Sequence, residues 1–182
     1  MYHYLKFELM ISKGPKKIFV SILVGITLFY APAVFAAQFL VTRVYDGNTV
    51  KAKSLSKEIT IRLVGIDAPE ISGKKNQPGQ PYSRKARDYL NHLVLNKMVK
   101  IEEYGQDRYR RTLAVIYVGD MNVNLRMVQV GLAEAYKGPP VKGFNPNPYR
   151  YAEDKARYEG INMWSQGDKY ISPKEWRKQQ KE

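Results

Sequence analysis

The chain contains no cysteine and only two histidines among its 182 residues. The lack of cysteine excludes disulfides, iron–sulfur clusters, thiol chemistry and cysteine-based zinc sites. His3 lies near the amino terminus, in a segment interpreted below as a leader, and His92 falls in a helical pattern that favours an ordinary surface or packing role. Mechanisms that need two histidines are therefore excluded. Catalysis would have to come from carboxylates, arginines, lysines, tyrosines or a metal bound through oxygen.

The first 36 residues are typical of an export signal. Basic residues precede an almost uninterrupted apolar run at positions 18–37, which closes with the small-residue pattern Val34-Phe35-Ala36. Because Pro32 suits a processing site better than a membrane span, we expect cleavage after Ala36. A run of about 20 residues is also long enough for an uncleaved anchor. The predicted localisation is therefore export, secreted or periplasmic, with a membrane tether through residues 18–37 as the alternative.

The remainder of the chain is strongly basic and long enough for one domain. Without the four lysines and one glutamate of the leader, the formal net charge falls from +13 to +10 over 146 residues. That length can bury a genuine core, and that charge favours a polyanionic partner. A merely solvated basic surface and a surface for membrane headgroups remain as alternatives. We divide the chain into a leader at 1–36, a domain at 37–170 and a polar tail at 171–182, for which we expect no site.

Short strands outnumber helices in the predicted secondary structure. Alternating apolar residues bounded by turns predict five strands, at 38–45, 49–54, 58–64, 98–103 and 113–118. Helical periodicity predicts three helices: one at 83–95 with Ser83 as its N-cap, one at 122–131 capped by Asn122, and one at 149–159. Residues 73–81 read as a loop. The expected fold is α+β and mainly β: a small five-stranded β-barrel with about three packed helices.

Two acidic turns lie close together in the sequence between Val44 and Glu70. In the second turn, Asp67 ends a strand, and Pro69 biases Ala68 toward an extended backbone. The Asp67 carboxylate and the Ala68 carbonyl are therefore expected to point at one metal ion, since hard cations such as calcium take such oxygens. An Asp that merely forms a turn is the alternative.

The same stretch carries groups suited to phosphodiester hydrolysis. That reaction needs positive charge on the nonbridging oxygens and an activated water in line with the leaving oxygen. We assign the water to Glu70, as general base or as the group that orients it. Arg62 alternates with apolar neighbours on its strand and so points away from the core. It is our candidate for clamping the phosphate, against a default of a solvated arginine.

Several motifs in order resemble the staphylococcal nuclease (thermonuclease) family. They are D-G-x-T-V at the first turn, R-L-x-G-I-D-x-P-E, the following loop and helix, D-R-Y-x-R-x-L-A, and G-L-A before the last helix; they cover most of residues 38–165. The ending N-M-W-S with P-K-E-W-R-K is similar to the tails of exported bacterial members. The resemblance implies an OB-fold barrel and a calcium-dependent phosphodiesterase acting on DNA and RNA.

The resemblance also implies roles for the second basic motif. Arg111 would supply a second guanidinium, whose fork binds two phosphate oxygens at once. Arg110 stands where the family usually has glycine, which leaves open a bent loop and the choice between the two arginines. Tyr109 would contact the nucleotide, or simply bridge core and solvent. Tyr136 is a further candidate for substrate binding.

Asn48 is the main departure from the family, which usually has a metal-ligating aspartate at this position of D-G-x-T-V. Asparagine keeps an oxygen ligand but removes a negative charge, so calcium affinity should fall, or magnesium or manganese should be preferred. Asp46, on the same turn, is a candidate for partial compensation.

Two functions remain open at this point, beside a weaker third, an adhesion or envelope-surface protein, for which the leader is the only support. The first is an exported, sugar-non-specific metal-dependent nuclease, with Arg62, Glu70 and Arg111 as catalytic residues and DNA or RNA as substrate. The second is a weakened or inactive OB-fold that binds single-stranded nucleic acid, for which a basic groove and tyrosines suffice. Glu70 favours the nuclease, because a glutamate would repel the phosphate backbone in a pure binding module. We infer no protein partner and expect a monomer.

Overall fold

The computed structural model describes residues 38–72 and 77–180. They fall in one compact unit that spans Phe35–Glu182. The predicted leader lies outside the described residues, so export stays a prediction. Within the described part of the chain, no helix is both long and apolar enough to cross a membrane.

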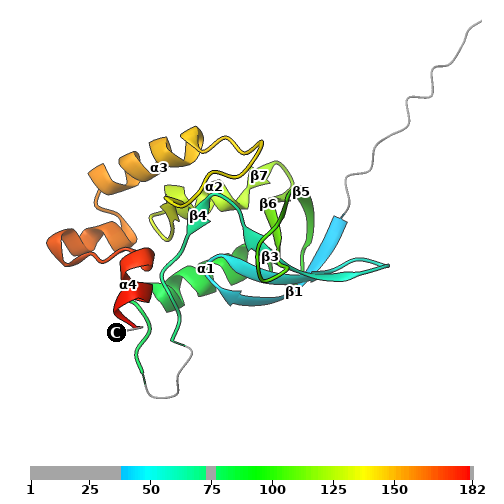
Figure 1. Cartoon of the computed structure of the whole chain (residues 1–182), viewed down its shortest axis with the longest axis horizontal. Helices are drawn as coiled ribbons and strands as arrows, with labels where there is room; N and C mark the ends of the chain where they lie inside the picture. The colour runs from blue at the N-terminus through cyan, green and yellow to red at the C-terminus, as the bar shows by residue number, and fades with distance from the viewer. Residues whose placement is uncertain (1–37, 73–76, 181–182) are drawn as a thin grey trace, which may run out of the picture. The chain divides into compact units, whose positions relative to one another are not determined.

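Five strands close into a barrel (Figure 1). They are β1 (Gln38–Asp46), β2 (Thr49–Lys53), β3 (Glu58–Leu63), β5 (Met98–Gln106) and β6 (Thr112–Val118). Antiparallel pairs give the order β3-β2-β1-β5-β6, and a parallel pairing of β3 with β6 closes the barrel. The short strand β7 (Met121–Asn122) extends β6. The predicted five-stranded barrel is confirmed, although β5 continues beyond the predicted end at residue 103.

The core follows the alternation of the strands. Apolar side chains from each strand point inward and are fully buried, among them Phe39, Val41, Val50, Ile61 and Ile116. Helix α1 (Ser83–Val94) packs on β1 through a buried stripe at Ala86, Leu90 and Val94, whose spacing of four matches one helical face. The helix is confirmed, but the predicted cap is wrong. Tyr82 occupies the N-cap position with a left-handed φ of 68°, and Ser83 is the first helical residue, buried at 3% exposure.

Two further helices match the predicted ones. Helix α2 (Val123–Gln129) begins as expected, because the side chain of Asn122 accepts a hydrogen bond from the Leu125 amide. The fully buried Asn124 donates to the carbonyls of Val64 and Ala114, at 2.9 Å each, and ties α2 to the barrel. Helix α3 (Asn147–Tyr158) packs against α2.

Besides β7, four elements were not predicted. Strands β4 (Ile66–Asp67) and β8 (Glu134–Ala135) form a small antiparallel ladder that pairs Ile66 with Ala135 and Asp67 with Glu134. A 3-10 helix, η1 (Asn162–Lys169), and helix α4 (Pro173–Gln179) follow α3. Each element has at most eight residues, too few for a clear periodicity in the sequence.

The carboxyl-terminal segment is held against the loop that precedes α1, and Figure 1 shows α4 near the start of α1. Gln80, which is 4% exposed, makes the link: its side chain donates to the Ile171 carbonyl at 2.7 Å and accepts from the Glu70 amide at 3.0 Å. The rings of Trp164 and Tyr170 also pack together, with centroids 4.5 Å apart. The chain beyond η1 is therefore attached directly to the loop that carries Glu70.

Candidate active site

A close approach of backbones brings the two acidic turns together. A Cβ atom placed on Gly47 would lie 2.7 Å from Ala68 Cβ and 2.8 Å from Ala86 Cβ, closer than real atoms come. Glycine is therefore required for the Asp46–Asn48 turn to pack on Ala68. The Asn48 carbonyl also accepts from the Leu63 amide at 2.8 Å, which fixes this turn beside the end of β3.

Asp67 is the centre of the site. It ends β4 and is 3% exposed, so its carboxylate needs charged or hydrogen-bonding partners. Arg62, projecting from the neighbouring strand β3, donates from Nη2 to Asp67 Oδ1 at 2.9 Å. This arginine is half-buried with 15% of its side chain exposed, so it does not have the freely solvated position that an isolated strand arginine would have.

A second arginine, Arg177 of helix α4, also binds Asp67. Arg177 binds Asp67 with both ends of its fork, Nη1 to Oδ1 at 3.1 Å and Nη2 to Oδ2 at 2.6 Å. Its Nη1 atom also forms an ion pair with Glu70 Oε1. The tail was expected to carry no site, and sequence reasoning missed this residue. The only signal for it was the W-R-K ending, and a basic tail residue by itself indicates nothing about where it folds.

Glu70 lies at the open side of the site, with 35% of its side chain exposed. Its backbone is fixed from both directions by Gln80, whose amide donates to the Glu70 carbonyl at 2.8 Å and whose side-chain oxygen accepts from the Glu70 amide. Glycine is required at position 79 as well, because a Cβ there would lie 2.9 Å from the Ser72 backbone nitrogen and 3.0 Å from the Glu70 carbonyl oxygen. A rigid backbone therefore presents a carboxylate that solvent reaches.

The charges of these groups are strongly coupled. Burial lowers the pKa of Arg62 and outweighs the attraction of Asp67, Asp46 and Glu70; the positive charge of Arg111 lowers it further. For Arg177, burial also opposes the charged form. Hydrogen bonds and electrostatic attraction from Asp67 and Glu70 outweigh this effect and raise the pKa of Arg177. Both guanidiniums remain charged at neutral pH, since arginine does not lose its proton in proteins.

Arg111 is held by its own acidic partner. It starts the segment that enters β6, the strand paired with β3, and its Nε atom donates to Asp107 Oδ2 at 2.7 Å. Burial raises the pKa of Asp107, but hydrogen bonds from Arg111 and Tyr109 prevail and the net pKa is lowered. Asp107 therefore orients Arg111 across this loop, and Arg111 lies next to Thr112, which pairs with Ile61 in the register of β3 and β6.

The two residues that precede Arg111, Tyr109 and Arg110, are exposed. Arg110 is exposed and has a φ of 60°, a left-handed conformation of the kind that favours glycine. The loop therefore has the bend expected of the family's glycine even though arginine occupies the position. Tyr109 is 64% exposed, and the guanidiniums of Arg108 and Arg111 lie 4.8 and 5.5 Å from its ring centroid. This ring and these charges suit stacking on a base or contact with a phosphate.

The oxygen donors proposed for a metal lie on the two packed turns. They are the Asp67 carboxylate, the Asn48 side-chain oxygen, the Ala68 carbonyl and Asp46. Asn48 is 6% exposed, and its Oδ1 atom accepts from the Thr49 hydroxyl at 3.2 Å. Asp46 is engaged locally, because its Oδ1 atom accepts from the Asn48 amide at 2.8 Å.

These donors fit a hard divalent cation by chemistry, since all are oxygens and two bear charge. The set carries little negative charge for a divalent cation, however. In residues 38–72 and 77–180, no three His, Cys, Asp or Glu side chains are grouped so that they could hold a metal.

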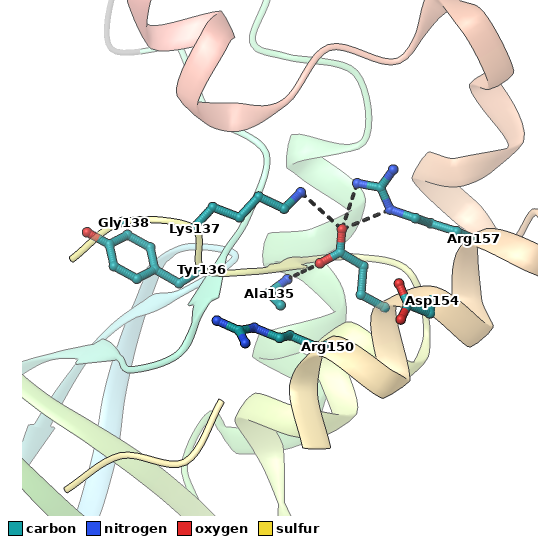
Figure 2. A pocket seen from close by; sticks show the side chains of 8 residues that line it. Ala135, Tyr136, Lys137, Gly138, Arg150, Asp154 and Arg157 are labelled. Atoms are coloured by element: carbon teal, nitrogen blue, oxygen red, sulfur yellow. Dashed lines mark hydrogen bonds and ion pairs between the residues drawn. The ribbon is translucent and has the colours of Figure 1, made fainter. Parts of the chain in front are cut away.

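Tyr136 lines a groove of about 580 Å³ (Figure 2). It follows β8, and its amide donates to the Gly65 carbonyl, next to β4. Its neighbours in the groove include Lys137, Arg150 and Arg157, with Lys137 and Arg157 both paired to Glu153. The groove is thus basic at its surface.

The closed barrel with packed helices and a carboxylate–guanidinium cluster beside β3 and β4 defines an α+β protein of the OB-fold class. A family model described as staphylococcal nuclease homologue matches residues 60–166. The chain belongs to this family and, with it, to the nuclease hydrolases.

Individual relatives agree with this assignment. A Haemophilus influenzae protein named an uncharacterized endonuclease is 38% identical over 143 residues, covering 78% of this chain and 73% of that protein. An Escherichia coli O157:H7 protein of the same name is 37% identical over 139 residues, covering 75% of this chain and 82% of that protein. The thermonuclease of Staphylococcus intermedius is 33% identical over 133 residues, covering 70% of this chain and 76% of that protein.

Proposed function

We propose that this protein is a metal-dependent nuclease that hydrolyses phosphodiester bonds of DNA, RNA or both. The supporting observation is the cluster formed by Arg62, Asp67 and Glu70, with Arg111 on the neighbouring chain segment, since Arg62 pairs with Leu113 across β3 and β6. The basic net charge supports a polyanionic substrate. The apolar leader supports an exported protein, secreted, periplasmic or tethered, and we propose that it acts as a monomer.

The chain's own residues divide the reaction among them. Arg62 and Arg111 approach from adjacent strands and would bind the nonbridging oxygens of one phosphate, so that their charges stabilise the negative charge that grows in the transition state. Glu70 accepts the proton of the attacking water or orients that water, because its carboxylate lies at the solvent-exposed side of the cluster. Tyr109 and Arg110, both exposed, would guide the nucleotide toward Arg111.

Asp67, Asn48 and the Ala68 carbonyl, with Asp46 nearby, are the residues that would hold the metal. A bound Ca²⁺, Mg²⁺ or Mn²⁺ supplies positive charge next to the scissile phosphate. Asp67 also positions Arg62 directly, through the 2.9 Å contact between Nη2 and Oδ1.

The test is cleavage of single-stranded DNA by the full chain in EDTA and in calcium, magnesium or manganese, with DNA binding measured separately. Glu70→Ala should lower the cleavage rate by about 10²- to 10⁴-fold, the usual contribution of a general base, and leave binding close to that of the parent. Glu159→Ala is the control, since this exposed glutamate pairs with Lys155 at the end of α3. Equal cleavage rates in the two variants would contradict the role of Glu70.

A nucleic-acid-binding module remains the second candidate. Asn48 in the metal-binding turn and the exposed Tyr109 flanked by arginines favour it. One outcome would identify the chain as an inactivated nuclease that now binds nucleic acid. In that outcome the parent binds DNA but does not cleave it with any of the metals tested, whereas Asn48→Asp does cleave it.

A further inference from the structure

Arg177 occupies a position that the family assignment does not explain. It lies in α4, beyond residues 60–166 matched by the family model, yet it contacts both acidic residues of the site. Its guanidinium engages each carboxylate oxygen of Asp67 and one oxygen of Glu70. These contacts join parts of the chain that are 110 and 107 positions apart, so the fold, and not local sequence, places the arginine there.

The position of Arg177 is built by specific contacts. Ile171, six residues before it, is fixed by the 2.7 Å hydrogen bond from the nearly buried Gln80. Ser172 caps α4 by accepting from the Glu175 amide at 3.2 Å, and Pro173 is buried under the helix. Since Gln80 also holds the Glu70 backbone, one side chain sets the spacing between α4 and the site.

A guanidinium and a metal ion compete for the same oxygens here. A calcium ion lies about 2.3–2.6 Å from its oxygen ligands, so an ion on Asp67 would be only a few ångströms from the Arg177 fork. Two positive charges at that distance repel strongly even at the effective dielectric of a protein surface. Arg177 would have to leave, and with 39% of its side chain exposed it has solvent on one side.

The local charge balance supports the same conclusion. In the observed state the negative charges of Asp67 and Glu70 are matched by Arg62 and Arg177, which leaves these four side chains neutral together, with Asp46 as the further carboxylate among the proposed donors. Asn48 adds no charge. The attraction for a divalent cation is therefore weak as long as Arg177 remains in place.

We propose that Arg177 belongs to the active site and competes with a divalent cation for Asp67 and Glu70, and thereby sets the metal affinity of the site. This inference rests on the proposed metal-dependent function. It predicts that the protein exchanges its own guanidinium for the metal, and that the α4 side chain, not the barrel, limits metal binding.

The test is calorimetric titration of the full chain with Ca²⁺ and with Mn²⁺, in the absence of nucleic acid. Arg177→Met removes the charge and keeps a long side chain; it should lower the metal dissociation constant by about tenfold or more, because a like charge near the ion is lost. Lys178→Met is the matched control: it makes the same charge change on the same helix at an exposed residue, and its affinity should stay within about twofold of the parent.

A second variant covers the case in which Arg177→Met does not fold, which circular dichroism would reveal. Arg177→Lys keeps the charge but loses the two-pronged grip on Asp67, so metal affinity should rise by a smaller factor. The inference is overturned if Arg177→Met, or where it is unfolded Arg177→Lys, binds both ions no more tightly than the parent, or if Lys178→Met gains as much.

Cleavage assays on the same proteins separate this inference from the proposed function. Tighter metal binding in Arg177→Met with no cleavage by any variant would support the competition and contradict the nuclease. Metal-dependent cleavage by the parent with unchanged metal affinity in Arg177→Met would support the nuclease and overturn the competition.

Discussion

Asp67 and Glu134 face each other across the β4–β8 ladder, and both are almost completely buried, at 3% and 2% exposure. Directly opposite residues of an antiparallel pair lie on the same face, so the backbone places these two carboxylates in closely similar positions. Their partners differ. Asp67 is bound by the guanidiniums of Arg62 and Arg177, and Glu134 by Lys137 and the Tyr170 hydroxyl.

Glu134 belongs to a structural network. Its Oε2 atom accepts from Tyr170 at 2.8 Å and from Lys137 at 3.2 Å, and Lys137 also reaches Glu153 of α3. Figure 2 shows Lys137 and Arg157 converging on one carboxylate, which is that of Glu153. Burial raises the pKa of Glu134 above its ordinary value, against the opposing effects of Lys137 and Tyr170. These contacts attach β8 to α3 and to the segment before α4.

The comparison shows that burial alone does not make a carboxylate a site residue. What distinguishes Asp67 is that neutral oxygen donors, the Asn48 side chain and the Ala68 carbonyl, lie on the adjacent turns. Exposure of the partner cation does not separate the two carboxylates, since 39% of the Arg177 side chain and 52% of the Lys137 side chain are exposed. Glu134 instead accepts from the Tyr170 hydroxyl and shares the Lys137 ammonium with Glu153.

The difference between Asp67 and Glu134 is tested most directly by neutralising each carboxylate in turn. Asp67→Asn should lower DNA cleavage by about 10²- to 10³-fold, because Arg62 loses its anchor and the metal loses its charged ligand. Glu134→Gln, the same chemical change on the opposite strand, should leave the rate within about threefold of the parent. Steady-state cleavage of single-stranded DNA at saturating metal measures both. Similar losses in the two variants would make the whole ladder part of the site.

Adding a negative charge near Asp67 should increase the functional difference between Asp67 and Glu134. Asn48→Asp adds a carboxylate to the turn that packs on Ala68, so we expect calcium affinity to rise by about tenfold, with a matching gain in cleavage at low calcium. Metal titrations of the parent and the variant measure this. An unchanged affinity would mean that position 48 does not contribute a ligand.

The smallest effect concerns the pH dependence of stability. Because the folded-state pKa of Glu134 lies above its ordinary value of 4.5, the folded state holds a proton that the unfolded state has already released. The stability of the parent should therefore fall as pH rises from about 4.5 through the folded-state pKa. Glu134→Gln lacks this titration, so its stability relative to the parent should rise over that window and then level off. Urea unfolding at a series of pH values measures the free energy of unfolding of the variant minus that of the parent, and a difference that falls with rising pH would contradict the prediction.

The sequence was most informative where a local pattern and a buried face coincide. Alternation identified the five barrel strands, and the spacing of Ala86, Leu90 and Val94 identified α1. Asn122 was recognised as a cap because its role depends on residues within one helical turn. Ser83 was misjudged, since the left-handed Tyr82 shifts the start of the helix by one residue, and backbone conformation of that kind has no clear signature in an isolated chain.

By itself, the sequence determined the barrel, the motif order that identifies the nuclease family, and the types of residue available for chemistry. Only the tertiary structure placed Arg177 on Asp67 and Glu70, set Glu134 opposite Asp67, and brought Tyr136 into one groove with Arg150 and Arg157. The physical reason is the distance along the sequence over which each interaction acts. Strand alternation, helix periodicity and caps act over a few residues, whereas an ion pair between positions 67 and 177 forms only after β4, the Gln80 loop and α4 have been folded onto one another.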